Sequence, residues 1–318
     1  MLNLNKSEVI SELKTNKYLN VFLVASPILA IITRMIIESL NLDKENILII
    51  SLRNTSLEIL PFNFLDIKPG NFDRYIEKIF FDSPTGRKIQ NHTDKYNKQF
   101  IVYCGWAYRE VNWLLRSPKC AGHIYIEEGQ GSFFNYIPYS RNKMSLFDKI
   151  KFNISNRENP NDGEGFFFRD DALLYIGMSK GIYPKIDKTK KYIINNLNEI
   201  KKYYEPKLLG ITQIGLTCSA SRLPTYNDWE IMMQKLIKVL PHGSFIKPHP
   251  SFTSSAKVFD KFKLIFDNIN NKNIKLCHSN INLELEMLYE KKNIIGPQSS
   301  IHIYALTFGS TYQKINLF

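Results

Sequence analysis

The stretch HIYIEEGQG, residues 123–131, decides how the chain is interpreted. A β-prone apolar run ends in two adjacent carboxylates and a glycine-rich turn, which is typical of a buried strand with acids at its carboxyl end. In open α/β sheets, ligands bind at the carboxyl ends of the strands. Glu127 and Glu128 are therefore candidates for a general base that takes a proton from a substrate. A solvated surface turn is the simpler alternative.

Two later stretches have the same form, an apolar run followed by polar residues: FIKPHP at 245–250 and NIIGPQSS at 293–300. His249 lies between Pro248 and Pro250. A proline restricts the residue before it to extended conformations, so this loop is predicted to be stiff. A rigid histidine at a strand end suits a phosphate contact or a general acid. The alternative is a turn histidine that is bonded to the backbone.

Hydroxyl and carboxylate side chains add further candidates. Ser299 and Ser300 stand where a strand ends and a helix begins, which offers free backbone N–H groups to an anion, although a simple N-cap is the alternative. Glu284 and Glu286 open the preceding helix and can accept hydrogen bonds from ribose hydroxyls, unless they only favour the helix start. The loop 217–222 is small and polar with one arginine, as a phosphate loop would be. The remaining donor-side candidates are Thr217 and Ser219 in this loop, and Lys247 and Pro250 beside His249.

Strand and helix patterns alternate along the chain. Apolar runs predict strands at 20–25 and 46–52, and Ser26-Pro27 predicts the start of a helix that continues to Leu40, since serine is a good N-cap and proline suits the first helical position. Further strands are predicted at 100–104, 123–126, 208–217, 244–246, 274–277 and 293–295, and a helix at 227–240. Strand–helix–strand units of this kind form parallel sheets.

Two such series follow one another, so the sequence predicts an α/β fold with two Rossmann-like domains. We assign residues 1–190 to the first domain and 205–318 to the second, with the connection in 180–206. Within that connection, 190–204 is predicted to be a solvent-facing helix. The length of 318 residues suits two domains of about 150 residues each.

Composition narrows the class of partner. The net charge of +12 favours an anionic partner such as a nucleic acid, an anionic membrane surface, or an acidic glycan or nucleotide. No known nucleic-acid-binding motif occurs, so nucleic acid is not expected. The four cysteines are isolated, which is typical of a reducing compartment. The apolar run at 21–33 is shorter than the ~20 residues that span a bilayer. We expect a cytoplasmic protein, with peripheral contact with the inner face of the membrane.

Together, these groups suit a direct displacement at an anomeric carbon. One half offers a base, at Glu127 or Glu128, for the acceptor hydroxyl. The other offers an imidazole and a serine pair for the leaving phosphate of a nucleotide sugar. If His249 and a helix N-terminus hold a single phosphate, no metal and no other cofactor is needed.

The order Glu-Glu-Gly, His-Pro, Ser-Ser across residues 123–302 resembles the bacterial GT-B sialyltransferases of lipooligosaccharide and capsule (polysialic acid) synthesis. The resemblance implies two Rossmann-like domains that face each other across a cleft, and metal-independent inverting transfer from CMP-sialic acid to a glycan or glycolipid. It implies Glu127 as the acceptor base and His249, Ser299 and Ser300 as contacts of the CMP phosphate. Glu286 or Glu284 would hold the ribose. Many relatives have Asp in the acidic pair, which leaves open which acid is catalytic.

Two other functions fit the same residues. The first is a transferase that uses CMP-Kdo or another CDP-linked donor, because such donors make similar demands on a phosphate site. The second is a non-catalytic relative that only binds an anionic glycan or lipid. Hydrolysis of the donor without acceptor separates the second alternative from an enzyme.

Overall fold

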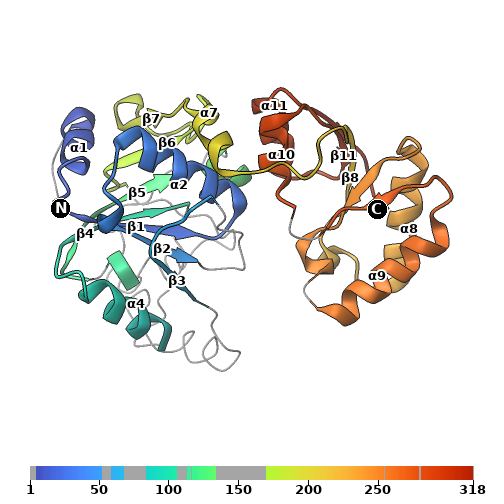
Figure 1. Cartoon of the computed structure of the whole chain (residues 1–318), viewed down its shortest axis with the longest axis horizontal. Coiled ribbons are helices and arrows are strands. Elements are labelled where there is room, and N and C mark those ends of the chain that lie inside the picture. Colours follow the sequence, from blue (N-terminus) through green and yellow to red (C-terminus); the bar gives the residue numbers. More distant parts are fainter. Residues whose placement is uncertain are drawn as a thin grey trace. The chain divides into compact units, whose positions relative to one another are not determined.

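The computed structural model of the chain describes residues 5–51, 59–67, 84–105, 113–115, 117–133, 170–253, 255–278 and 281–317. The chain divides into two compact units, Met1–Tyr203 and Tyr204–Phe318 (Figure 1). We call them the first unit and the second unit. Each is built on its own sheet, and every strand pair in both sheets is parallel.

The first unit has a seven-stranded sheet in the order β3-β2-β1-β4-β5-β6-β7. The chain runs outward from β1 to β3 and then returns to β4 on the other side of β1, so the order reverses between β1 and β4. Every residue of β1, β2 and β4 is buried, as expected for parallel strands covered on both faces. The strands are β1 (Leu19–Val24), β2 (Ile47–Ser51), β3 (Phe64–Asp66), β4 (Phe100–Cys104), β5 (Cys120–Ile126), β6 (Leu174–Gly177) and β7 (Lys191–Ile193).

Helix α2 shows how local sequence signals determine the first βαβ turn. It begins at Pro27, and the Ser26 side chain caps it by accepting a hydrogen bond from the Leu29 N–H at 3.4 Å. It ends at Leu40, where Asn41 takes a left-handed conformation with φ of 50°. The predicted helix after Ser26-Pro27 is confirmed, and Figure 1 shows α2 lying across the sheet. Among the described residues, the other helices and 3-10 turns of this unit are α1 (Lys6–Leu13), α4 (Pro84–Asp94), α7 (Leu197–Ile200), η1 (Lys44–Asn46), η2 (Gly129–Phe133), η4 (Lys188–Lys190) and η5 (Lys201–Tyr203).

The segment 190–204 is not the single helix that its composition predicts. Lys191–Ile193 forms β7 and pairs in parallel with β6, and only Leu197–Ile200 is α-helical. The free edge of β6 offers backbone hydrogen bonds to any extended segment that reaches it, and this tertiary contact outweighs weak helix propensity. Residues 191–203 accordingly belong to the first unit.

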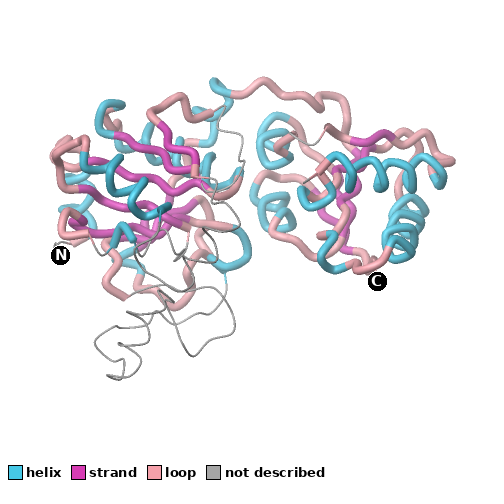
Figure 2. The backbone as a smooth tube through the Cα atoms, turned by 90° about the horizontal axis from the view of Figure 1, so that it is seen from below, coloured by secondary structure: helices cyan, strands magenta, loops and turns pink. Residues whose placement is uncertain are grey.

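The second unit has a five-stranded sheet in the order β10-β9-β8-β11-β12, and its order reverses between β8 and β11. Figure 2 shows these strands between two groups of helices. The strands are β8 (Gln213–Leu216), β9 (Phe245–Lys247), β10 (Lys275–Leu276), β11 (Asn293–Gly296) and β12 (Thr311–Lys314). The helices and 3-10 turns are α8 (Tyr226–Val239), α9 (Ala256–Ile269), α10 (Leu283–Tyr289), α11 (Ile301–Thr307), η6 (Ala220–Arg222) and η7 (Pro250–Phe252).

The core of the second unit fixes the turn that follows β9. Phe252, at the end of η7, is completely buried between Trp229 of α8 and Phe262 of α9, with ring centroids 5.0 and 4.6 Å away. The predicted helix at 227–240 is therefore present, and its Trp229 packs against Phe252 of the turn that follows His249. Within the described part of the chain, no helix is both long and apolar enough to cross a membrane.

Candidate functional site

The acidic pair follows β5, next to the strand that borders the reversal of strand order in the first unit. Glu127 is completely buried. Its Oε2 accepts hydrogen bonds from the backbone N–H groups of Met178 and Ser179 at 2.7 and 3.2 Å, and Oε1 lies 3.4 Å from the Ser179 hydroxyl. A Cβ at Gly177 would lie only 2.4 Å from Oε2, so the close approach requires glycine there. Glu127 thus ties β5 to the loop after β6.

Glu128 is partly exposed and lies on the other side of the strand end. A Cβ at Gly105, which follows β4, would be 2.1 Å from Oε2 of Glu128. The Glu128 carboxylate therefore lies against the carboxyl end of β4, where the strand order reverses. Its backbone N–H donates to the Ser132 hydroxyl at 2.7 Å, which holds the turn. The two acids diverge, as adjacent residues at the end of a strand do.

Three loops of the second unit leave neighbouring strands at one edge of the sheet. Residues 217–222 follow β8, residues 248–252 follow β9, and residues 297–300 follow β11. Because β8 lies between β9 and β11, these loops are neighbours, and the reversal of strand order lies within the set. This edge is where an open α/β sheet binds its ligand.

His249 is held tightly within these loops. Its backbone N–H donates to Oγ1 of Thr217 at 2.7 Å. Its ring Nδ1 lies 2.9 Å from the Ser251 hydroxyl and accepts the Ser251 N–H at 3.2 Å. The Ser251 hydroxyl also accepts the Ala220 N–H at 2.8 Å and lies 3.5 Å from the Ser219 hydroxyl. The predicted residues Thr217, Ser219 and His249 are thus brought together, while Pro250 opens η7 and is exposed.

Ser251 is a site residue that the sequence analysis missed. The available signal was its position two residues after a strand-end histidine, a spacing at which a side chain and a backbone N–H can bond. The signal becomes specific only in the structure, where the Ala220 N–H of the loop after β8 bonds to the Ser251 hydroxyl and completes the network.

Positive charge surrounds the His249 ring. The pKa of His249 is lowered below its usual value. The largest cause is desolvation of the ring, and the charges of Lys247 and Arg222 add to it. Burial also lowers the pKa of Lys247, and the carboxylate of Glu284 opposes that effect. Burial raises the pKa of Glu284 in turn. Near neutral pH the edge therefore presents a neutral imidazole beside the arginine, with Lys247 and Glu284 close behind.

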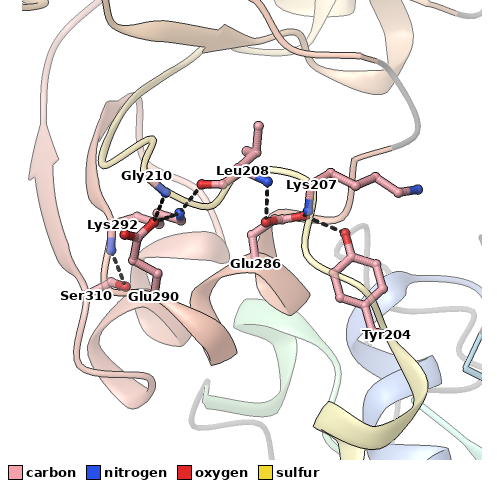
Figure 3. Close-up of polar contacts among 8 residues, drawn as sticks. All are labelled: Tyr204, Lys207, Leu208, Gly210, Glu286, Glu290, Lys292 and Ser310. Carbon is pink, nitrogen blue, oxygen red and sulfur yellow. Dashed lines mark hydrogen bonds and ion pairs between the residues drawn. The ribbon is translucent and has the colours of Figure 1, made fainter.

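Glu286 lies apart from this set although it shares helix α10 with Glu284. Its buried carboxylate accepts hydrogen bonds from the Tyr204 hydroxyl at 2.6 Å, the Lys207 N–H at 2.8 Å and the Leu208 N–H at 2.9 Å (Figure 3). Residues two apart on a helix point in different directions, so one acid faces Lys247 and the other faces the start of the second unit.

A buried lysine just before β11 also bonds to the segment that begins the second unit (Figure 3). The Lys292 ammonium, with no exposed surface, donates to the Leu208 carbonyl at 2.7 Å and pairs with Glu290 at 2.6 Å. Glu290 also accepts the Gly210 N–H at 3.0 Å. The side chains of Glu286, Glu290 and Lys292 thus fasten residues 204–210 to the rest of the second unit.

The serine pair lies at the start of α11, and both residues are partly exposed. The Ser299 hydroxyl accepts the Ile301 N–H at 3.1 Å, while the Ser300 side chain makes no capping bond. Among the described residues, no three His, Cys, Asp or Glu side chains gather as they would around a metal ion.

Comparison with known proteins identifies the fold. No protein-family model and no curated protein sequence matches the chain. The structure of S. aureus MnaA with UDP is similar with a TM-score of 0.55 and 11% identity, over 93% of this chain and 78% of that one. A putative UDP-N-acetylglucosamine 2-epimerase from Listeria monocytogenes gives 0.55 and 11%, over 94% and 79%. UDP-N-acetylglucosamine 2-epimerase from Rickettsia bellii gives 0.51 and 11%, over 94% and 79%. The chain has the GT-B fold, with two Rossmann-like units.

Proposed function

We propose that the protein is a glycosyltransferase that processes a nucleotide sugar, and specifically one that moves sialic acid from CMP-sialic acid to a hydroxyl of a surface glycan or glycolipid. The observation that carries the proposal is the edge of the second sheet, where His249 is fixed by two neighbouring loops and flanked by Arg222 and Lys247. A fixed donor beside positive charge suits a phosphate. The GT-B fold supports a nucleotide sugar as the donor, and the order of the three motifs is the reason to choose CMP-sialic acid.

On the donor side, the neutral His249 ring, Arg222 and the hydroxyls of Ser299 and Ser300 would contact the single phosphate of CMP. The ribose role falls to Glu284, because it is near Lys247, whereas the Glu286 carboxylate already accepts three hydrogen bonds. Burial raises the pKa of Glu284, and the charge of Lys247 would oppose that effect and favour the carboxylate form that accepts from ribose hydroxyls.

On the acceptor side, the proposed base is Glu128. The sequence favours Glu127, but that carboxylate is completely buried and bonded to two backbone N–H groups. A group bonded in this way is poorly placed to reach an incoming hydroxyl, and such donors favour its ionised form without offering access. Glu128 is partly exposed at the reversal of strand order. Glu127 would instead hold the strand end that presents Glu128.

The reaction is an inverting displacement. The acceptor oxygen forms a bond to the anomeric carbon as the bond from that carbon to the phosphate oxygen breaks. The acceptor proton passes to Glu128, and CMP leaves with its negative charge facing His249 and Arg222. We propose that these groups suffice without a metal or other cofactor, because the leaving phosphate is single and already an anion. The net charge of +12 would aid approach of an anionic acceptor surface at the membrane.

The test is release of CMP from CMP-sialic acid by the full chain, with and without sialylated oligosaccharide acceptors, beside CMP-Kdo and UDP-N-acetylglucosamine. We expect CMP release from CMP-sialic acid, stimulated by acceptor. Release of CMP from CMP-Kdo, but not from CMP-sialic acid, would show that the donor is CMP-Kdo. Conversion of UDP-N-acetylglucosamine with no action on either CMP-sugar would refute the proposal in favour of an epimerase. Binding of a CMP-sugar without any turnover would favour a non-catalytic relative.

A further inference from the structure

The hydrogen bonds around His249 have fixed directions. A backbone N–H can only donate, so Ser251 Oγ is the acceptor in its 2.8 Å contact with the Ala220 N–H. For the same reason, His249 Nδ1 is the acceptor in its 3.2 Å contact with the Ser251 N–H. Because Nδ1 is an acceptor, the Ser251 hydroxyl is the donor in its 2.9 Å contact with that nitrogen. A directed chain runs from the β8 loop through Ser251 to one nitrogen of the ring.

That direction determines the tautomer. A neutral imidazole whose Nδ1 accepts hydrogen bonds carries its proton on Nε2. The contacts with Ser251 are made by Nδ1 and not by Nε2, and the residue is exposed. The ring therefore offers an N–H donor to the surroundings while its other nitrogen is engaged by the turn.

The same arrangement opposes protonation. A proton on Nδ1 would point at the Ser251 N–H, so the hydrogen bond from that N–H to Nδ1 would be lost. The charged groups around the ring act in the same direction, because Lys247 from β9 and Arg222 from η6 are both cations. The donor on Nε2 thus persists at neutral pH without a positive charge on the ring.

We propose that Ser251 is a positioning residue that fixes His249 with Nδ1 as acceptor, so that Nε2–H is the donor presented to the nucleotide phosphate. The identity of the anion rests on the function proposed above, whereas the hold of Ser251 on the ring does not. It follows that His249 stabilises the leaving phosphate by a hydrogen bond and does not deliver a proton to it.

The experiment compares Ser251→Ala, which removes the hydroxyl, with Ser251→Thr, which retains it. Thr253→Ala is the matched control, because the Thr253 hydroxyl lies in the same turn but donates to the Pro250 carbonyl at 3.1 Å. Nitrogen-15 NMR of the ring, assigned by difference with His249→Asn, gives the tautomer and the titration midpoint of His249 in the full chain. Affinities for CMP and for inorganic phosphate are measured on the same samples.

The wild type should show an unprotonated Nδ1 and a protonated Nε2 in the neutral ring. Ser251→Ala should raise the His249 titration midpoint by about 0.5 to 1 pH unit, the size of one ordinary hydrogen bond to the neutral form. It should weaken CMP and phosphate binding by about three- to tenfold. Ser251→Thr and Thr253→Ala should keep the wild-type values.

An unchanged midpoint in Ser251→Ala, or a neutral wild-type ring protonated on Nδ1, overturns the positioning role whatever the nucleotide does. A raised midpoint in a protein that binds neither probe supports the hold of Ser251 on the ring and refutes the phosphate, and with it the proposed function. The two failures are therefore distinguishable.

Discussion

Replacing Glu286 by glutamine should loosen the second unit and leave the nucleotide site in place. Oε1 of Glu286 accepts from both the Tyr204 hydroxyl and the Lys207 N–H, and Oε2 accepts from the Leu208 N–H. A glutamine can turn its one oxygen to the first two donors, but its NH₂ group then faces the Leu208 N–H. The variant loses the charge at two bonds and turns the third into a contact between donors.

The magnitude follows from the burial of the group. Hydrogen bonds to a charged partner contribute about 1.5–3 kcal/mol each, and a buried donor left without an acceptor costs about 1–3 kcal/mol. Allowing for the bonds that glutamine keeps, Glu286→Gln should destabilise the second unit by about 2–4 kcal/mol. With a urea dependence of about 1–3 kcal/mol per molar, the midpoint of unfolding should fall by about 1 M or more.

The assay uses the single tryptophan of the second unit. Trp229 is buried in the core under η7, and the other tryptophans of the sequence, Trp106 and Trp113, belong to the first unit. In a background in which those two are phenylalanine, tryptophan fluorescence follows the unfolding of the second unit within the full chain. CMP affinity is measured on the folded protein.

Glu284→Gln is the matched control, since it makes the same substitution two residues earlier on α10. We expect it to leave the urea midpoint near that of the wild type and to weaken CMP binding. A Glu286→Gln variant that unfolds at the wild-type midpoint but no longer binds CMP would refute this reasoning and return the ribose role to Glu286.

Three further outcomes are expected. Glu128→Gln should lower turnover by about 10²–10⁴-fold with CMP affinity unchanged, whereas Glu127→Gln should mainly lower the stability of the first unit. Initial rates and thermal unfolding distinguish the two variants. A loss of turnover in Glu127→Gln, with a loss of stability in Glu128→Gln, would contradict the choice of base. Gly105→Ala should also slow turnover without weakening CMP binding, because its Cβ would meet Glu128 Oε2 at 2.1 Å and displace the carboxylate; an active variant would show that Glu128 is not the base. CMP affinity should stay constant from pH 7 to 8, because the pKa of His249 is lowered and the ring is already neutral there; a site that needs the imidazolium would instead lose affinity severalfold, as calorimetry would record.

Local signals in the sequence account for much of the fold. Ser26-Pro27 predicts the start of α2 because a cap and a first-turn proline act within a few residues. Apolar runs likewise predict the strands whose ends carry the candidate acids and His249. The edge strand β7 escapes this reasoning, because Lys191–Ile193 becomes a strand only by pairing with β6.

The candidate site divides in the same way. The motifs place acids, an imidazole and hydroxyls at strand ends, but not their partners across the sheet. Nothing in the local sequence distinguishes Glu284 from Glu286, since the difference arises from Lys247 on one side and Tyr204 on the other. Equally, only the pairing of β8 with β9 brings the Ala220 N–H to Ser251 and completes the network at His249.

The central claim is that the edge of the second sheet binds a cytidine nucleotide through His249. Isothermal titration calorimetry of the full chain with CMP and with UDP, on the wild type, His249→Asn and His242→Asn, tests it most directly. His242 is an exposed histidine at the opposite end of β9 and serves as the control. We predict that CMP binds in preference to UDP, that His249→Asn weakens CMP binding about tenfold or more, and that His242→Asn binds as the wild type does. Preference for UDP, or wild-type CMP affinity in His249→Asn, would contradict the account.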